Sequence, residues 1–291
     1  MTPVAPLPAA LVEPYLAALG VEPRRPDDAL LADVAARHLA RVPFESFTKL
    51  RLHAERPAGP ARRPDDERFL RDLVALGAGD TCFGIAHALG GLLAALGFRV
   101  HFAGARVGDA AADNHVACVA TWRDHPLLVD CGFATPLPVP VPLERDVAAR
   151  EVVVPYARHR FVPAPGDRFV LEEWDGARSV WVSRYTLLAR PRPFEDFHAP
   201  IDQSFALGRD SYFLQRLFAV KNEPSRRVAL LTDRLSVTTA AGPVETKLDS
   251  LAALVAAAET HLGIARDHGD AAARVLRDTF GIDPFDPARA P

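Results

Sequence analysis

The spacing of the apolar residues changes near residue 98, and this change is the strongest constraint on the fold. Before it, apolar residues recur every three or four positions, the period of an amphipathic helix, over residues 7–20, 27–41, 67–76 and 82–97. After it, short runs of β-like residues are separated by Gly, Asp and Pro. These runs read RVHFAGARV, HVACVATW, PLLVDCGF, RFVLEEW and SVWVSRYTLL. The sequence therefore predicts an N-terminal helical bundle over residues 1–97 and a central antiparallel β-barrel over residues 98–195.

The last third of the chain mixes the two patterns. We expect a helix near residues 211–220, then two strands, RVALLTD and LSVTTA, and two helices near 248–262 and 271–280. We interpret residues 196–291 as a C-terminal α/β lid. The predicted fold class is therefore a multi-lobed α+β protein.

Two segments show no periodicity. Residues 52–66 are rich in Pro, Arg and Ala, which predicts an exposed loop. Residues 136–142, PLPVPVP, have a proline at every second position and cannot pair as a central strand. We expect this second segment to be an extended connector on the surface.

The composition excludes several classes of function. The 34 basic and 37 acidic residues nearly cancel, leaving a net charge of -3 and no field that would attract nucleic acid or anionic lipid. Apolar stretches are interrupted before the roughly 20 residues that a membrane span needs, and the N-terminus lacks a signal-peptide pattern. Three irregularly spaced cysteines fit a reducing compartment better than a disulfide framework. We expect a cytoplasmic protein that acts on small molecules, without a membrane or nucleic-acid partner.

Cys82 stands at the start of a predicted helix. In GAGDTCFGIAHALGGLLAALG, Asp80 or Thr81 can cap the helix and Gly97 can end it. Unpaired backbone N–H groups and the positive end of the helix dipole favour a thiolate there, which is the nucleophilic form of cysteine. A buried, inert cysteine is the alternative. Cys118 and Cys131 lie among apolar strand residues and are expected in the core.

His115 and Asp130 lie on two strands joined by a tight turn. A two-residue loop at 122–123 or 124–125 places residue 130 or residue 134 opposite His115. Both registers put the imidazole and the Asp130 carboxylate on the same face of the sheet, because side chains alternate along a strand. A carboxylate beside a histidine can orient the ring and stabilise its cation. The pattern therefore predicts a nucleophile, base and acid formed by Cys82, His115 and Asp130.

Several motifs together resemble the arylamine N-acetyltransferase family. They are RVPFESFTKL at 41–50, Cys82 at a helix start, Asn114-His115, LVDCGFATP at 128–136, DSYFLQRLFAV and RVALLTDRLSV. The resemblance implies a cysteine-protease-like core of Cys82, His115 and Asp130. It also implies ping-pong transfer of an acyl group from acetyl-CoA, or another acyl thioester, to an aromatic amine or hydrazine.

The resemblance also implies which residues surround this core. Phe133 and Phe213 would bind the acceptor, and Ser211 would lie near the acyl-CoA co-substrate. No permanently bound cofactor is implied. His and Cys residues show no paired spacing, so we expect no metal.

The chain departs from the family pattern around the nucleophile. The family has Arg-Gly-Gly-x-Cys followed by an acidic or amide residue and then Asn, whereas this chain reads Ala-Gly-Asp-Thr-Cys82 with Gly84 and Ala86. The family arginine pairs with the glutamate that corresponds to Glu45, so Glu45 lacks that partner unless Arg62, Arg63 or Arg71 replaces it. A partly buried carboxylate left unpaired is destabilising or takes up a proton, so we expect some compensation. Three alternatives remain open: an amide synthase that acts on a carrier-protein thioester, a hydrolase, and a non-catalytic binding protein. The sequence does not predict the oligomeric state.

Overall fold

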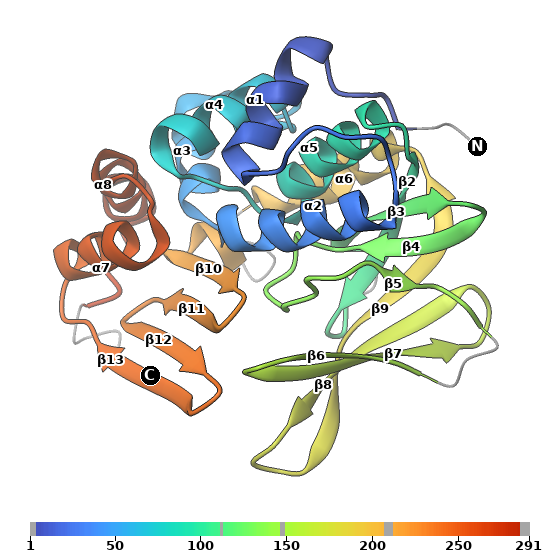
Figure 1. The fold of residues 1–291 in the computed structure, drawn as a ribbon. Coiled ribbons are helices and arrows are strands. Elements are labelled where there is room, and N and C mark those ends of the chain that lie inside the picture. The colour runs from blue at the N-terminus through green and yellow to red at the C-terminus, as the bar shows by residue number, and fades with distance from the viewer. Residues whose placement is uncertain (1–3, 111–112, 146–148, 207–211, 286–291) are drawn as a thin grey trace.

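The N-terminal region is a layer of helices (Figure 1). A computed structural model describes residues 4–110, 113–145, 149–206 and 212–285. The helices of this region are α1 (Ala9–Leu19), α2 (Asp28–Arg41), α3 (Phe47–Glu55), α4 (Asp66–Leu76) and α5 (Cys82–Ala95). They confirm the predicted helical N-terminal region. Within the described ranges, no helix is long and apolar enough to cross a membrane.

Aspartate side chains cap the N-termini of α2 and α4. Asp27 accepts a hydrogen bond from the Leu30 amide at 2.6 Å, and Asp65 does the same for the Arg68 amide at 2.9 Å. Eleven of the fourteen residues of α5 are buried, so this helix forms the centre of the layer. The predicted loop at 52–66 is partly wrong, because α3 continues to Glu55 and a 3-10 turn forms at Pro60–Arg62.

An eight-stranded antiparallel sheet curls beneath the helices into a nearly closed barrel (Figure 1). Its strand order is β5-β4-β3-β2-β9-β8-β7-β6. The strands are β2 (Arg99–Val107), β3 (His115–Trp122), β4 (His125–Val129), β5 (Val141–Pro142), β6 (Arg150–Val154), β7 (Ala157–Ala164), β8 (Arg168–Asp175) and β9 (Val180–Arg192). The predicted central sheet is confirmed. The sequence pattern does not predict β6 and β7, where charged and apolar residues alternate irregularly.

The proline-rich segment at 136–142 contributes buried side chains and a short strand to the barrel. Leu137 and Val141 are buried in the barrel interior, and β5 pairs with β4 at the sheet edge, the position at which a strand tolerates proline. The expectation of a surface connector is therefore wrong for the inward side chains of this segment.

The turn between β3 and β4 differs from both predicted loops. Trp122 pairs with His125, so the loop residues are Arg123 and Asp124, which have φ angles of 47° and 67°. A two-residue turn of this left-handed kind matches the twist of the strands, although arginine is not a residue that signals it. The register is intermediate between the two predicted ones. It still leaves His115 and Asp130 on one face, because a shift of two in the pairing preserves side-chain parity.

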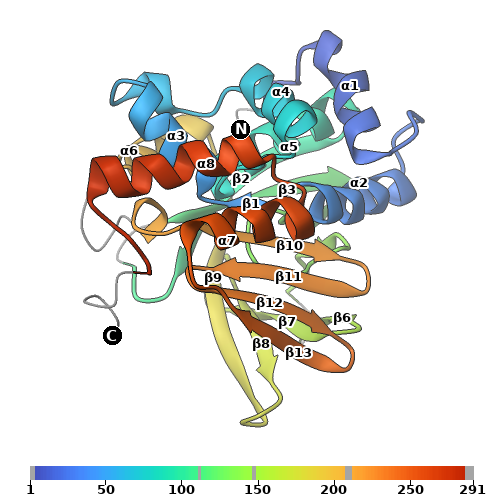
Figure 2. The same ribbon diagram turned by 90° about the vertical axis from the view of Figure 1, so that its left-hand side faces the viewer.

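A second sheet and three α-helices, the first of them α6 (His198–Ser204), form the described part of the C-terminal region (Figure 2). The sheet order is β1-β10-β11-β12-β13, with β1 (Phe44–Glu45) supplied by the N-terminal region. The other elements are β10 (Phe218–Glu223), β11 (Arg226–Leu231), β12 (Arg234–Thr239), β13 (Gly242–Lys247), α7 (Leu251–Ala257) and α8 (Arg266–Arg274). The predicted helix at 211–220 is wrong: only Tyr212–Leu214 form a 3-10 turn, and Phe218 begins a strand paired on both sides. The domain boundaries at residues 97 and 195 stay predictions.

Candidate active site

Cys82 is the first residue of α5 and is 4% exposed. The segment before it is held against β1, because Asp80 and Phe44 form a β-bridge and the Asp80 carbonyl accepts a hydrogen bond from the Glu45 amide at 3.1 Å. Gly79 permits this approach, since a Cβ there would lie 1.8 Å from the Pro43 carbonyl oxygen. The thiol is thus set at the helix start by backbone packing from its N-terminal side.

His115 and Asp130 are joined by a buried hydrogen bond. The His115 Nε2 atom lies 2.9 Å from the Asp130 Oδ2 atom, and both residues are 2% exposed. Since Nε2 faces Asp130, the Nδ1 atom is the ring nitrogen left for Cys82. The Cys82 Sγ atom also lies 4.0 Å from the carbonyl oxygen of Asn114, the residue before His115. The structure therefore brings Cys82, His115 and Asp130 together, and their catalytic roles stay predictions.

Tyr185 completes this hydrogen-bond network and is not predicted from the sequence. Its hydroxyl donates to Asp130 Oδ2 at 2.7 Å, while the amide of Gly132 donates to Asp130 Oδ1 at 3.1 Å. The carboxylate thus accepts three hydrogen bonds, counting that from His115. Tyr185 lies on β9, two strands from β3 in the sheet, and this pairing cannot be read from local sequence.

The electrostatic environment favours a charged imidazole. Burial opposes the charged ring, but the charge and the hydrogen bond of Asp130, together with Cys82, outweigh it and raise the pKa of His115 well above its ordinary value of 6.5. The protonated ring stabilises a neighbouring thiolate. This arrangement can generate a nucleophile near neutral pH.

The other predicted site residues lie at different places. The Phe133 ring is 5.2 Å from the His115 ring and 5.2 Å from the Tyr185 ring, measured between centroids. Phe213 instead packs on Phe44, at 5.6 Å. Ser211 lies outside the described residues. Phe133 is thus the predicted aromatic residue that borders the imidazole.

Cys118 and Cys131 are fully packed, with 0% and 3% exposure. Burial, with a smaller effect from the charge of Asp130, raises the pKa of both thiols. The prediction that they are core residues is confirmed. Cys82 differs from them because it interacts with His115, whose pKa is raised.

Glu45 has no arginine partner among the described residues. Its Oε2 atom accepts from the Thr48 amide at 2.9 Å, and its Oε1 atom has no hydrogen-bond partner among the described residues. Burial, assisted by the charge of Asp80 and opposed by hydrogen bonds from Thr48, raises the pKa of Glu45 to about 7. Burial therefore favours the protonated form of Glu45, in place of an ion pair.

The three arginines proposed as partners of Glu45 are engaged elsewhere. Arg62 donates to the backbone carbonyls of His53 and Arg56. Arg63 lies 3.7 Å from Asp202, and Arg71 lies 3.2 Å from Asp72. None of the three therefore replaces the family arginine.

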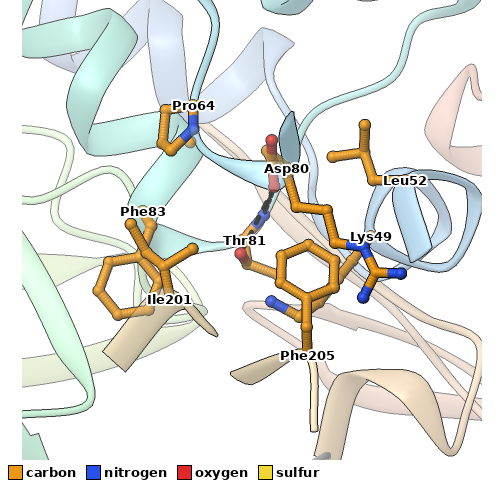
Figure 3. Close-up of a pocket in the computed structure, with 10 residues that line it drawn as sticks. Lys49, Leu52, Pro64, Asp80, Thr81, Phe83, Ile201 and Phe205 are labelled. Carbon is orange, nitrogen blue, oxygen red and sulfur yellow. Dashed lines mark hydrogen bonds between the residues drawn. The ribbon is translucent and has the colours of Figure 1, made fainter. Parts of the chain in front are cut away.

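A buried cluster of charges lies at the start of α5 instead. Arg68 Nη2 is 3.0 Å from Asp80 Oδ2. Lys49, which is 2% exposed, donates to the Ser204 hydroxyl at 2.5 Å and lies 4.0 Å above the Phe205 ring. Figure 3 shows Lys49 and Phe205 beside Asp80 and Thr81. Burial lowers the pKa of Lys49 to about 8, and the charges of Asp80 and Cys82 oppose this effect.

The cluster was missed because each residue looks ordinary in isolation. A lysine at position 49 and an arginine at position 68 fit the polar faces of their helices.

In the part of the chain that the structure describes, no group of three or more His, Cys, Asp or Glu side chains is placed to hold a metal ion.

Comparisons with known proteins agree with this architecture. The sequence model of the N-acetyltransferase family matches residues 29–270. The arylamine N-acetyltransferase of Mycobacterium smegmatis is 26% identical with a TM-score of 0.75, over 90% of this chain and 98% of that one. The Mycobacterium marinum enzyme in complex with CoA is 22% identical, with a TM-score of 0.76 over 91% and 98%. The Salmonella typhimurium enzyme is 18% identical, with a TM-score of 0.78 over 93% and 99%.

A comparison with curated proteins finds no match. The fold and the family match nevertheless define an acetyltransferase. More particularly, this chain belongs to the arylamine N-acetyltransferase family, as its motifs predict.

Proposed function

We propose that this acetyltransferase moves an acyl group from acyl-CoA, through a thioester on Cys82, to an aromatic amine or hydrazine. The observation that carries the proposal is the buried hydrogen-bond network of His115, Asp130 and Tyr185 beside Cys82. A carboxylate that accepts three hydrogen bonds is a fixed acceptor for the imidazole, which keeps the ring oriented toward the sulfur.

The first half-reaction forms the acyl-enzyme. The Cys82 thiolate attacks the carbonyl carbon of the acyl thioester, and the C–S bond to CoA breaks as His115 gives its proton to the departing thiol. In this proposal, backbone N–H groups at the start of α5 stabilise the negative oxygen of the tetrahedral intermediate. Acyl-CoA is the proposed donor because the M. marinum relative was solved with CoA.

The second half-reaction releases the product. His115, now neutral, takes a proton from the attacking amine, the new C–N bond forms, and the C–S bond to Cys82 breaks to restore the thiolate. Phe133 borders the imidazole and offers an apolar, aromatic surface for the acceptor. Such a surface orients an aromatic amine close to the thioester but gives water no comparable orientation.

Two mass-spectrometric experiments test the proposal. The protein is first incubated with a panel of acyl-CoA thioesters, and intact-protein mass spectrometry is expected to find a single adduct, which peptide mapping assigns to Cys82. The Cys82→Ala variant, which retains Cys118 and Cys131, is the control for labelling at another thiol. Absence of the adduct from the wild-type protein for every donor refutes the covalent route and favours a binding protein.

The acceptor is tested on the preloaded enzyme. An aniline-type amine, a hydrazine and an aliphatic amine are added separately, and loss of the adduct mass is followed with time. The aromatic amine or the hydrazine is expected to discharge the adduct fastest. Decay at the rate set by water in every case refutes the arylamine acceptor and favours an intramolecular or carrier-bound acceptor, as in an amide synthase.

A further inference from the structure

The Asp80 carboxylate occupies the space beside the first turn of the nucleophile helix. One oxygen accepts from the Thr81 amide at 2.7 Å, and the other pairs with Arg68 at 3.0 Å. Figure 3 shows the hydrogen bond between Asp80 and Thr81 next to Lys49. Asp80 and Arg68 are both 6% exposed, so the pair is shielded from water. This anion lies two residues before Cys82 and faces the helix that Cys82 begins.

Gly84 lies in the first turn of α5, and the absence of a side chain there leaves room for this carboxylate. A Cβ built on Gly84 would lie 2.3 Å from Asp80 Oδ2 and 2.4 Å from its carboxyl carbon. Both distances are far below van der Waals contact. A glycine weakens a helix relative to alanine, so its position near the start of α5 works against helix stability. The carboxylate and any side chain at position 84 cannot occupy this space together.

Asp80 also connects the elements that surround Cys82. Its backbone pairs with β1 through Phe44 and Glu45, and its carboxylate pairs with Arg68 on α4. The Lys49 ammonium on α3 is attracted electrostatically to both Asp80 and Cys82. Displacing the carboxylate would therefore disturb the packing and the charge balance around the thiol together.

We propose that Asp80 is a positioning residue of the acyl-transfer reaction, and that Gly84 is required because it admits the Asp80 carboxylate against the start of the nucleophile helix. The role in acyl transfer rests on the proposed function. A buried ion pair contributes little net stability, because desolvation offsets much of the attraction. Orientation of the first turn of α5, and hence of Cys82, is the role that the contacts support.

A double-mutant cycle tests this coupling without any acyl substrate. Asp80→Ala, Gly84→Ala and the double variant are compared with the wild-type protein by the rate at which iodoacetamide alkylates Cys82. We expect either single substitution to slow alkylation about tenfold, since small misplacements of a reactive group have effects of this size or larger. We expect the double variant to be no slower than Asp80→Ala, because an alanine at position 84 has nothing to displace once the carboxylate is absent.

Gly91→Ala provides a matched control on the same helix. A Cβ on Gly91 would lie 3.5 Å from its nearest neighbour, which is ordinary contact. This variant is expected to be alkylated within about twofold of the wild-type rate, as for a substitution without a steric consequence. If Gly84→Ala behaves like Gly91→Ala, or if the two single effects multiply in the double variant, the inference is overturned.

Asp80→Asn keeps the test decisive if Gly84→Ala does not fold, as judged by circular dichroism. The amide retains the shape and an acceptor for the Thr81 amide but removes the negative charge that Lys49 and Arg68 share. Asp72, 3.9 Å from Arg68, and Arg62, whose charge also acts on Lys49, stay in place. We expect the pH of half-maximal alkylation to fall, because a negative charge near the thiolate is lost. Glu45, His115 and Asp130, which also lie near Cys82, are unchanged in this variant. An unchanged profile in this variant, together with a wild-type alkylation rate in Asp80→Ala, overturns the inference. Failure of the proposed function is recognised separately, because the wild-type protein would then form no acyl adduct while alkylation could still be measured.

Discussion

Glu45→Gln should stabilise the protein at high pH. Because the folded chain holds the Glu45 proton with a pKa of about 7, against an ordinary value of 4.5, the folded state binds more protons than the unfolded state between these pH values. The free energy of unfolding of the wild-type protein therefore falls as the pH rises through this window. Glutamine retains an acceptor for the Thr48 amide and stays neutral, so the variant escapes this loss.

The size of the effect follows from the two pKa values. Integrating the proton linkage from pH 5 to pH 8 gives a loss on the order of 2–3 kcal/mol for the wild-type protein that the variant does not share. With an m value of about 3 kcal/mol/M, the urea midpoint of the variant relative to the wild-type protein should rise by roughly 1 M between these pH values. At pH 5 the two proteins should differ by less than about 1 kcal/mol.

Urea unfolding followed by circular dichroism at pH 5 and pH 8 measures this difference. Glu13→Gln, the same change at an exposed position of α1, is the control and should unfold with the wild-type protein at both pH values. Titrations of the other groups cancel in the comparison. The reasoning is refuted if the difference between Glu45→Gln and the wild-type protein is independent of pH, or if the variant is destabilised more at pH 8, as loss of a charged, paired carboxylate would produce.

Three further substitutions probe the candidate site. Cys82→Ala should abolish acyl transfer with the circular dichroism spectrum unchanged, because it removes a single sulfur atom; residual turnover beyond a trace would contradict the covalent route. Tyr185→Phe deletes one hydrogen bond to a carboxylate and should lower the free energy of unfolding by about 1.5–3 kcal/mol. It should also slow acyl-enzyme formation, and wild-type values in urea unfolding and in single-turnover assays would exclude a role for this hydroxyl. Gly132→Ala would place a Cβ 3.1 Å from the Cys82 Cα atom, and should slow acyl-enzyme formation about tenfold in the single-turnover assay. An unchanged rate would show that the neighbouring atoms move to accommodate the Cβ without displacing Cys82.

Local patterns predict those parts of the site that lie on single elements. The helix start at Cys82 follows from the apolar period, but the predicted capping does not form, because the N-cap residue Thr81 makes no side-chain capping hydrogen bond and Asp80 accepts from the Thr81 amide instead. The shared face of His115 and Asp130 follows from strand parity alone. That parity holds although the turn at Arg123 and Asp124 differs from both predicted loops. Parity is insensitive to a register shift of two, which is why an incorrect register still predicted the correct neighbours.

Contacts between distant elements could not be predicted in this way. Tyr185 reaches Asp130 only because β9 pairs with β2, and Arg68 reaches Asp80 only because α4 packs beside the start of α5. The environment of Glu45 could not be predicted either. Its Oε1 atom has no hydrogen-bond partner among the described residues, and burial raises the pKa of its carboxyl group. Such features depend on the packing of the whole chain and leave little mark on the local sequence.

The pairing of β1 with β10 has a consequence for the order of folding during synthesis. Phe44 pairs with Val220, and the same residue forms the bridge to Asp80 beside the nucleophile. The strand that supports Cys82 therefore lacks its partner until residues 218–223 have left the ribosome, long after the helices themselves can form. A nascent chain that ends before β10 exposes one edge of β1 next to a reactive thiol. The nucleophile thus acquires its final surroundings only when most of the polypeptide is available.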